Sequence, residues 1–187
     1  MNPAVFLDRD GVITEDPPHY AHRLDQLRII PGSGQAIQLL NAHNFRVFVI
    51  SNQSGVARGY YREEDVKIFN DEMERLLAGE GAHIDAIYYC PHHPDAVVEC
   101  YKMDCDCRKP KPGMIMQAAQ KYSIDIPNSF VIGDKWSDIE AGRAAGCKTI
   151  LVLTGHGKGE YQTTEGPADY YATDLFEAVN KYILKGH

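Results

Sequence analysis

Two pairs of aspartates, far apart in the sequence, are the residues of this chain with the clearest chemical use. Asp8 and Asp10 follow the apolar run 4–7, and Asp134 and Asp138 follow the apolar run 130–132. In an extended segment, residues two apart point to the same side, so the Asp8 and Asp10 carboxylates can face one small volume. Magnesium prefers such hard oxygen ligands, and a carboxylate can also attack phosphorus. The pattern predicts a magnesium site for phosphate chemistry, with Asp134 reaching the same cation.

Two of these features have an alternative reading. The pair Asp10-Gly11 is by itself as typical of a turn as of a catalytic motif. Asp138 stands where a helix is expected to begin, and an acid there stabilises the positive end of the helix dipole. Asp138 is therefore either a helix cap or a further metal ligand.

Hydroxyl and amide groups follow another apolar run, at 46–50. Ser51 and Asn52 come directly after it, and a hydroxyl with backbone N–H groups at a strand end can bind phosphate oxygens. The same residue types also simply form turns. Arg58 lies a few residues further on and is expected to contact the rest of a substrate.

A basic stretch supplies the positive charge that a phosphate needs. It contains Arg108, Lys109 and Lys111, and prolines at 110 and 112 hold it extended. Because Lys111 stands directly before a predicted helix, we expect it to point toward the strand ends. A lysine there would neutralise the repulsion between carboxylate and phosphate. The alternative is an ordinary solvated loop.

Cysteine and histidine residues are concentrated in the segment 90–107. In a cytosolic chain, clustered cysteines indicate metal binding rather than disulfides. Four nitrogen and sulfur ligands in two close pairs suit a closed, structural tetrahedral zinc site. The predicted ligands are Cys90, His92, Cys105 and Cys107. His93 or Cys100 could replace one of them, and the alternative is a set of ordinary reduced cysteines.

Size and composition limit the classes of function. The chain has 187 residues, 44% of them hydrophobic, and we expect one domain over 1–187. A net charge of −7 argues against general nucleic-acid binding. No apolar run approaches the roughly 20 residues that span a bilayer, and no secretory signal is visible. We therefore expect a cytoplasmic monomer that acts on a small molecule and contacts neither nucleic acid nor membrane.

Apolar runs alternate with amphipathic stretches along the chain. Strands are predicted at 4–7, 46–50, 86–89, 130–132 and 149–153, with a weaker one near 169–171. Helices are predicted at 34–43, 63–78, 113–122, 138–145 and 173–183, and 155–167 is expected to be a loop. This alternation predicts an α/β fold with a doubly wound, mostly parallel sheet. In such sheets ligands bind outside the carboxyl ends of the strands, which would bring the polar clusters together.

Taken together, these motifs resemble those of the haloacid dehalogenase (HAD) superfamily of phosphatases. The matching positions, over residues 5–138, are Asp8-x-Asp10-Gly11-Val12, Ser51, Lys111 and Gly133-Asp134-Lys135-x-x-Asp138. The resemblance implies a Rossmann-like fold, Mg²⁺ dependence and a phospho-aspartate intermediate on Asp8. It also implies that Asp10 is the general acid and gives magnesium its backbone carbonyl, with Lys135 adjoining the metal site.

Longer stretches resemble one branch, the D-glycero-D-manno-heptose-1,7-bisphosphate 7-phosphatases, which serve lipopolysaccharide or surface-glycan precursor synthesis. These are 6–13, 51–59, 90–94 and 107–113. The resemblance implies a minimal cap, a zinc-stapled loop at about 90–107, and a 1-phosphate held by Arg108 and Lys109 near Asn52 and Arg58. Histidinol-phosphate phosphatases share the four motifs and the zinc loop and are the alternative. A phosphate-binding protein with a decayed site is a further alternative, against which the intact acidic motifs argue.

Overall fold

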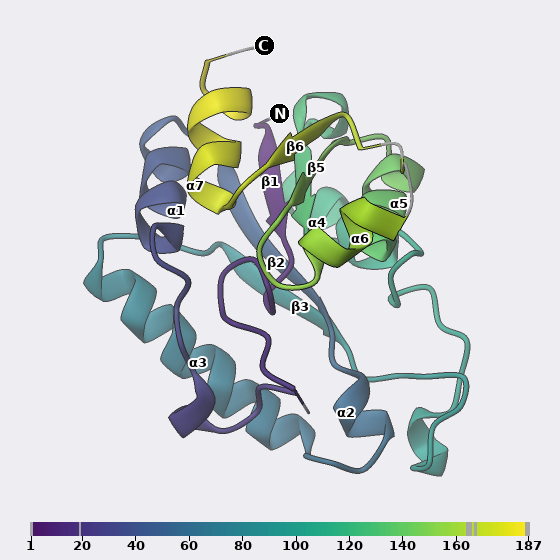
Figure 1. The fold of residues 1–187 in the computed structure, drawn as a ribbon. Coiled ribbons are helices and arrows are strands. Elements are labelled where there is room, and N and C mark those ends of the chain that lie inside the picture. Colours follow the sequence, from purple (N-terminus) through teal and green to yellow (C-terminus); the bar gives the residue numbers. More distant parts are fainter. Residues whose placement is uncertain (1, 19, 164–165, 167, 186–187) are drawn as a thin grey trace.

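The protein is described by a computed structural model, which covers residues 2–18, 20–163, 166 and 168–185. Six strands form one sheet in the order β3-β2-β1-β4-β5-β6, and neighbouring strands are all parallel (Figure 1). The strands are β1 (Ala4–Leu7), β2 (Arg46–Asn52), β3 (Ala86–Cys90), β4 (Phe130–Gly133), β5 (Lys148–Val152) and β6 (Tyr170–Ala172). The predicted doubly wound α/β fold is confirmed.

Helices cover both faces of the sheet (Figure 1). One face carries α1 (Ser33–Ala42), α3 (Glu63–Gly79) and α7 (Leu175–Glu177), which continues as a π-helical segment, Ala178–Ile183. The other face carries α4 (Gly113–Tyr122) and α5 (Trp136–Ala145). None of the helices in the described ranges has the length and apolar character needed to cross a membrane.

The packing of the central strand β1 explains why its sequence is continuously apolar. Val5 and Leu7 pack in the hydrophobic cluster on the α1 and α3 face, whereas Ala4 and Phe6 pack in the cluster on the α4 and α5 face. All four side chains are fully buried. A strand covered on both faces needs apolar residues at every position, because neighbouring side chains point to opposite sides.

The strand order puts the predicted polar residues at one edge. The chain builds β1, β2 and β3 outward in one direction and then returns to place β4 beside β1, with Leu7 opposite Ile132. A crevice forms where the order reverses in this way, outside the carboxyl ends of the strands. Asp8 and Asp134 directly follow the two strands that flank this point, and Ser51 lies at the end of β2.

The connection at 155–167 differs from the sequence prediction. It contains α6 (Gly157–Thr163), although Gly157 and Gly159 lower the helix propensity. Trp136 donates its backbone N–H and its indole N–H to Glu160, so contacts with α5 hold this helix. Residues 164, 165 and 167 of the predicted loop lie outside the described residues. A second short helix that was not predicted, α2 (Ser54–Ala57), follows β2.

Candidate active site

Three aspartates meet at the carboxyl ends of β1 and β4. Asp8, Asp134 and Asp138 are all buried, and one carboxylate oxygen of each lies within 4.8 Å of the others. Asp138 also caps α5, because its Oδ2 accepts a hydrogen bond of 3.1 Å from the Lys135 backbone N–H. The helix-cap interpretation of Asp138 is thus confirmed, and the same carboxylate belongs to the acidic cluster.

The acidic cluster has the properties of a site for a divalent cation. Among the described residues, Oδ1 of Asp134 is buried without a hydrogen-bond partner. Burial and the charge of Asp8 raise the pKa of Asp134 to about 8. A hard cation would supply the missing partner and offset the repulsion, and these oxygen ligands suit magnesium. Gly11, with φ of +89°, lies so close to Asp134 that a Cβ atom there would overlap the carboxylate.

Lys109, and not Lys111, is the lysine of the acidic cluster. Its Nζ lies 2.8 Å from Asp8 Oδ1 and 2.6 Å from Asp138 Oδ1, and it is 4% exposed. Burial lowers the pKa of Lys109, but Asp138 and Asp8 outweigh burial and raise it. Lys109 is therefore charged within the site.

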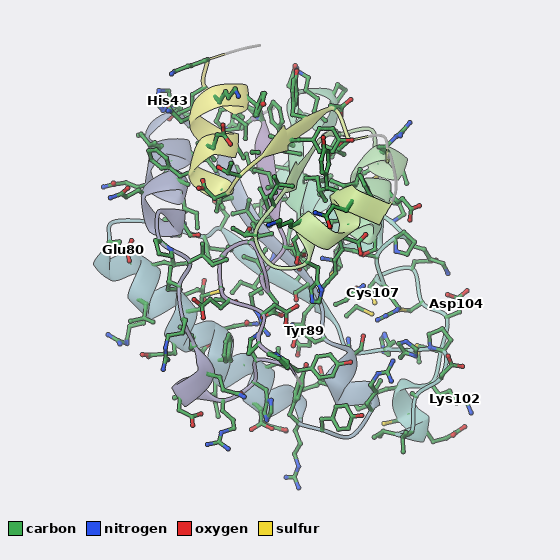
Figure 2. The ribbon with its side chains drawn as sticks, viewed as in Figure 1. His43, Glu80, Tyr89, Lys102, Asp104 and Cys107 are labelled. Carbon is green, nitrogen blue, oxygen red and sulfur yellow. The ribbon has the colours of Figure 1, made fainter. Side chains whose placement is uncertain are left out.

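The assignment of Lys111 to this position was wrong. Its Nζ pairs with Asp104 at 2.7 Å, and its side chain is 39% exposed. Asp104 lies at the outer edge of the molecule, along the long connection that also carries Lys102 and Cys107 (Figure 2). The Lys111 amino group is thus on the surface.

Asn52 determines which of the two lysine side chains points into the site. Its side chain makes two hydrogen bonds with the Lys109 backbone: Nδ2 donates to the carbonyl oxygen at 3.0 Å, and Oδ1 accepts from the N–H at 3.1 Å. This pairing fastens the basic stretch to the end of β2. The Lys109 amino group also donates to the Ile50 carbonyl oxygen at 2.8 Å. Asn52 therefore positions Lys109, a role not foreseen from the sequence.

Asp10 lies outside the cluster of three aspartates and has different partners. Arg9, which is 1% exposed, donates from Nε and NH2 to the two carboxylate oxygens at 3.0 and 2.9 Å. Thr14 Oγ1 donates to Oδ1 at 3.2 Å. Burial raises the pKa of Asp10 although the Arg9 charge opposes it. A carboxyl group with a raised pKa can hold the proton that a general acid needs.

A cavity of about 890 Å³ adjoins these groups. Of the candidate residues named from the sequence, those in its lining are Asp8, Asp10, Ser51, Asn52, Lys109, Lys135 and Asp138. The lining also contains Asp16, Pro17, Pro18, Tyr20, Tyr60, Ser137 and His156. Most of these additional residues lie on irregular connections, where no periodicity marks a side chain as belonging to the site.

Lys135 lies between the cavity and the loop that follows β1. Its Nζ is 3.1 Å from Asp16 Oδ2, which also accepts a hydrogen bond from His156 Nε2 at 3.0 Å. Burial lowers the pKa of Lys135, but Asp134, Asp8 and Asp16 raise it by more. Lys135 therefore adds a second positive charge beside the acidic cluster.

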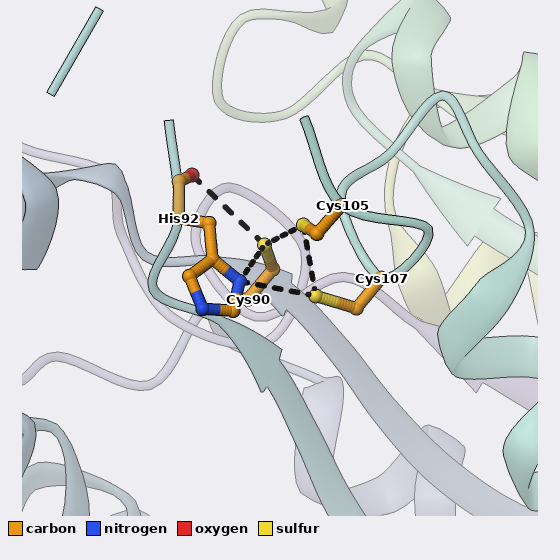
Figure 3. Close-up of side chains that lie close together, drawn as sticks. All are labelled: Cys90, His92, Cys105 and Cys107. Atoms are coloured by element: carbon orange, nitrogen blue, oxygen red, sulfur yellow. Dashed lines mark hydrogen bonds between the residues drawn. The ribbon is translucent and has the colours of Figure 1, made fainter. Parts of the chain in front are cut away.

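The four predicted zinc ligands form a compact cluster (Figure 3). Their nitrogen and sulfur atoms lie within 4.8 Å of one another, from Cys90 at the end of β3 and from His92, Cys105 and Cys107 on the following connection. The two thiols of the second pair are 3.1 Å apart, and Cys107 Sγ is 3.5 Å from His92 Nδ1. The donor set and its closed arrangement fit a four-coordinate metal.

The possible replacement ligands lie elsewhere. His93 Nδ1 accepts a hydrogen bond of 3.0 Å from the Asp95 backbone N–H, and Cys100 is exposed. Arg108 follows the last cluster residue and donates from NH1 to Ser54 Oγ at 2.8 Å and to the His92 carbonyl oxygen at 3.2 Å. Burial and the charges of Arg108 and Arg58 lower the pKa of His93, so each of these cations lies near His93. Arg58 and Arg108 lie outside the described cavity lining.

Comparison with known proteins shows to which family the chain belongs. A model of HAD-hydrolase-like proteins matches residues 106–178. A D-glycero-beta-D-manno-heptose-1,7-bisphosphate 7-phosphatase of Pasteurella multocida is 47% identical over 156 residues, which cover 83% of this chain and 84% of the relative. The corresponding protein of Haemophilus influenzae is 42% identical over 181 residues and covers 95% of each chain. The chain belongs to this phosphatase family.

The structural comparison extends the agreement over the whole fold. The crystal structure of D,D-heptose 1,7-bisphosphate phosphatase from B. bronchiseptica, complexed with magnesium and phosphate, superposes with a TM-score of 0.88 at 34% identity. The match covers 98% of this chain and 99% of that one. As a family member the chain is a HAD-type phosphatase, an enzyme that hydrolyses phosphate esters.

Proposed function

We propose that this enzyme removes the 7-phosphate of D-glycero-D-manno-heptose 1,7-bisphosphate through a phospho-aspartate on Asp8. The observation that carries the proposal is the meeting of Asp8, Asp10 and Lys109 at one cavity in a chain of this family. Of the two aspartates, Asp8 has the carboxylate that adjoins both the lysine and the acidic cluster. This contact supports Asp8 as the nucleophile, with Asp10 left to transfer the proton.

The chemistry follows from these placements. Asp8 attacks the phosphorus, and Asp10 donates a proton to the departing sugar oxygen and then takes one from the attacking water. Lys109 stabilises the negative charge of the transferred phosphoryl group. Asp8, Asp134 and the Asp10 carbonyl would hold Mg²⁺, which when bound neutralises phosphate charge. Ser51 would donate its hydroxyl to a phosphate oxygen.

The second phosphate of the substrate would bind beside Arg108. Both hydrogen bonds of this guanidinium go to neutral oxygens, and no ion pair with a described carboxylate neutralises it. Arg58 adds a further positive charge near His93. A phosphate dianion is the ligand that such a pair of cations favours, and arginine can bind it by two parallel hydrogen bonds.

The Cys/His cluster is proposed to hold structural Zn²⁺. Cys107 directly precedes Arg108 in the sequence and lies two residues before Lys109. A metal bound by Cys107 would therefore fix the start of the basic stretch. The long connection between β3 and α4 also carries His92 and Cys105, whereas Cys90 ends β3. A closed four-ligand site leaves no coordination position for substrate. Zinc would therefore act on stability and on the positions of Arg108 and Lys109. We also propose that the chain is one domain and acts as a cytoplasmic monomer.

Substrate assays test the proposal directly. Purified enzyme with Mg²⁺ is given the α and β anomers of heptose 1,7-bisphosphate, histidinol phosphate and p-nitrophenyl phosphate, and released phosphate is measured. We expect the heptose bisphosphate to have the highest kcat/KM. Arg108→Ala should lower that value by about ten- to a hundred-fold, as expected for a charged hydrogen bond, and should affect p-nitrophenyl phosphate little. Preference for histidinol phosphate, or equal losses on both esters, would overturn the substrate assignment.

A further inference from the structure

Gln53 is a buried side chain with no assigned part in the reaction, yet it joins two groups of the active site. It directly follows β2 and is 1% exposed. Its Nε2 donates to Asp10 Oδ2 at 3.0 Å and to Ser51 Oγ at 2.8 Å. The two N–H bonds of one amide group thus bridge the predicted proton donor and the predicted phosphate-binding hydroxyl.

Tyr61 fixes the orientation of this amide. Its hydroxyl donates to Gln53 Oε1 at 2.8 Å, so the oxygen of the amide is turned away from Asp10. Burial raises the pKa of Tyr61, which keeps its hydroxyl protonated as a donor. All the strong hydrogen-bonding groups of the Gln53 amide are then satisfied. If the amide turned over, its oxygen would face the Asp10 carboxylate and repel it.

Neighbouring residues hold the Tyr61 ring in the position that this hydrogen bond needs. The Tyr61 ring lies against Gly55 in α2, where a Cβ atom would overlap the ring. The ring of His22 stacks on the Tyr61 ring at 4.8 Å between centroids and 9° between planes. Tyr61 is 7% exposed. These two contacts hold the tyrosine with its hydroxyl at the amide.

One residue neutralises the Asp10 carboxylate and another fixes the direction in which it points. Arg9 neutralises the carboxylate by a two-point contact and is itself held by the Asn70 side chain and by Phe69, whose ring centroid is 4.4 Å from the guanidinium carbon. Gln53 is uncharged and adds nothing to that neutralisation. What it adds is a fixed link between Oδ2 of Asp10 and the Ser51 hydroxyl, which no other described contact makes.

We propose that Tyr61 and Gln53 form a positioning pair that holds the Asp10 carboxyl group in line with the phosphate bound at Ser51, so that its proton reaches the departing oxygen. The inference rests on the proposed role of Asp10 as general acid. Neither member of the pair touches the reacting atoms. Losing the pair leaves the nucleophile and the cations in place but lets the acid turn away from the leaving group.

Leaving-group dependence tests this role. Heptose 1,7-bisphosphate has an alkoxide leaving group that needs protonation, whereas p-nitrophenolate leaves without it. The value of kcat/KM reports transfer to Asp8 before the phosphoenzyme is hydrolysed. Gln53→Glu keeps the shape of the side chain but replaces both donors by a carboxylate that faces Asp10. Tyr61→Phe removes only the hydroxyl that orients the amide.

The expected result is a loss confined to the alkyl ester. Gln53→Glu should lower kcat/KM for the heptose bisphosphate by about ten- to a hundred-fold, part of the roughly 10²- to 10⁴-fold that general acids contribute. Tyr61→Phe should lower it by about two- to ten-fold, the scale of one neutral hydrogen bond. Activity on p-nitrophenyl phosphate should change by less than about three-fold for both, since that ester needs no acid.

Matched controls separate this from a general loss of structure. Tyr89→Phe removes a partly buried hydrogen bond from a tyrosine hydroxyl to Glu63, and Gln117→Glu adds a carboxylate on the exposed side of α4. Both should leave the ratio of the two activities unchanged. Asp10→Asn is measured in parallel, and urea unfolding shows which variants are folded. If Gln53→Glu does not fold, Tyr61→Phe alone decides the question.

Each outcome has a definite consequence. Equal losses on the two esters for Gln53→Glu and Tyr61→Phe, with Asp10→Asn still selective for the alkyl ester, would overturn the positioning pair and leave the role of Asp10 intact. An unselective Asp10→Asn would overturn both. If the wild-type enzyme hydrolysed glucose 6-phosphate but not the heptose bisphosphate, the proposed substrate would fail. The positioning pair would then be judged on glucose 6-phosphate.

Discussion

Replacing Lys109 and Lys111 in turn distinguishes the buried lysine from its exposed neighbour. The sequence pattern favours Lys111 as the catalytic lysine, whereas the structure places the Lys109 amino group between Asp8 and Asp138. We expect Lys109→Met to abolish most activity and Lys111→Met to leave it nearly unchanged. Methionine matches the length of lysine and fills the same space without the charge.

The magnitudes follow from burial and contacts. Removing Lys109 leaves two buried carboxylates without their cation, and breaking a buried pair in this way costs about 3–5 kcal/mol. That is a large part of the roughly 5–15 kcal/mol by which domains are stable. The ion pair of Lys111 with Asp104 is exposed at both ends and contributes at most about 1 kcal/mol. Loss of one preorganised charge at the phosphoryl group should lower kcat by about 10²- to 10³-fold.

The assay combines steady-state kinetics with urea unfolding. Phosphate release gives kcat and kcat/KM at saturating Mg²⁺, and the unfolding midpoint with its slope gives the free energy of unfolding. Circular dichroism establishes that each variant is folded at the assay temperature. A Lys111→Met enzyme that lost as much activity as Lys109→Met would refute the reasoning. So would a Lys109→Met enzyme with wild-type turnover.

Three further predictions concern the nucleophile and the two metal sites. Asp8→Asn should remain folded, as circular dichroism can check, but its kcat should fall by several orders of magnitude because an amide is a poor nucleophile. Near wild-type turnover would exclude the phospho-aspartate. Purified protein should contain about one zinc per chain, and Cys107→Ser should lower zinc content and melting temperature together, as metal analysis and calorimetry can check. The folded pKa of Asp134, about 8, lies above its unfolded value, so without Mg²⁺ stability should fall as pH rises toward 8. Added Mg²⁺ should therefore raise the melting temperature more at pH 8 than at pH 6, and an equal rise at both would contradict this.

Much of the fold and of the acidic site follows from the sequence because the signals are local. A strand buried on both faces must be apolar throughout, so β1, β2, β4 and β5 are visible as continuous apolar runs. Parallel strands end at the same edge of a sheet, so the residues just after them, Asp8 and Asp134, must approach each other. The Cys/His cluster is equally visible, because its two close pairs of ligand types stand at each end of one connection.

The sequence alone does not decide which side chains enter the site from irregular segments. Lys109 and Lys111 are the same residue type on one proline-flanked stretch, and only the pairing of Asn52 with the Lys109 backbone turns the first inward. The link from Tyr61 through Gln53 to Asp10 depends on a tight approach of the ring to Gly55. Such choices are made by packing and by hydrogen bonds between distant segments. Periodicity in the sequence carries no information about them, because no repeating backbone geometry fixes where a loop side chain points.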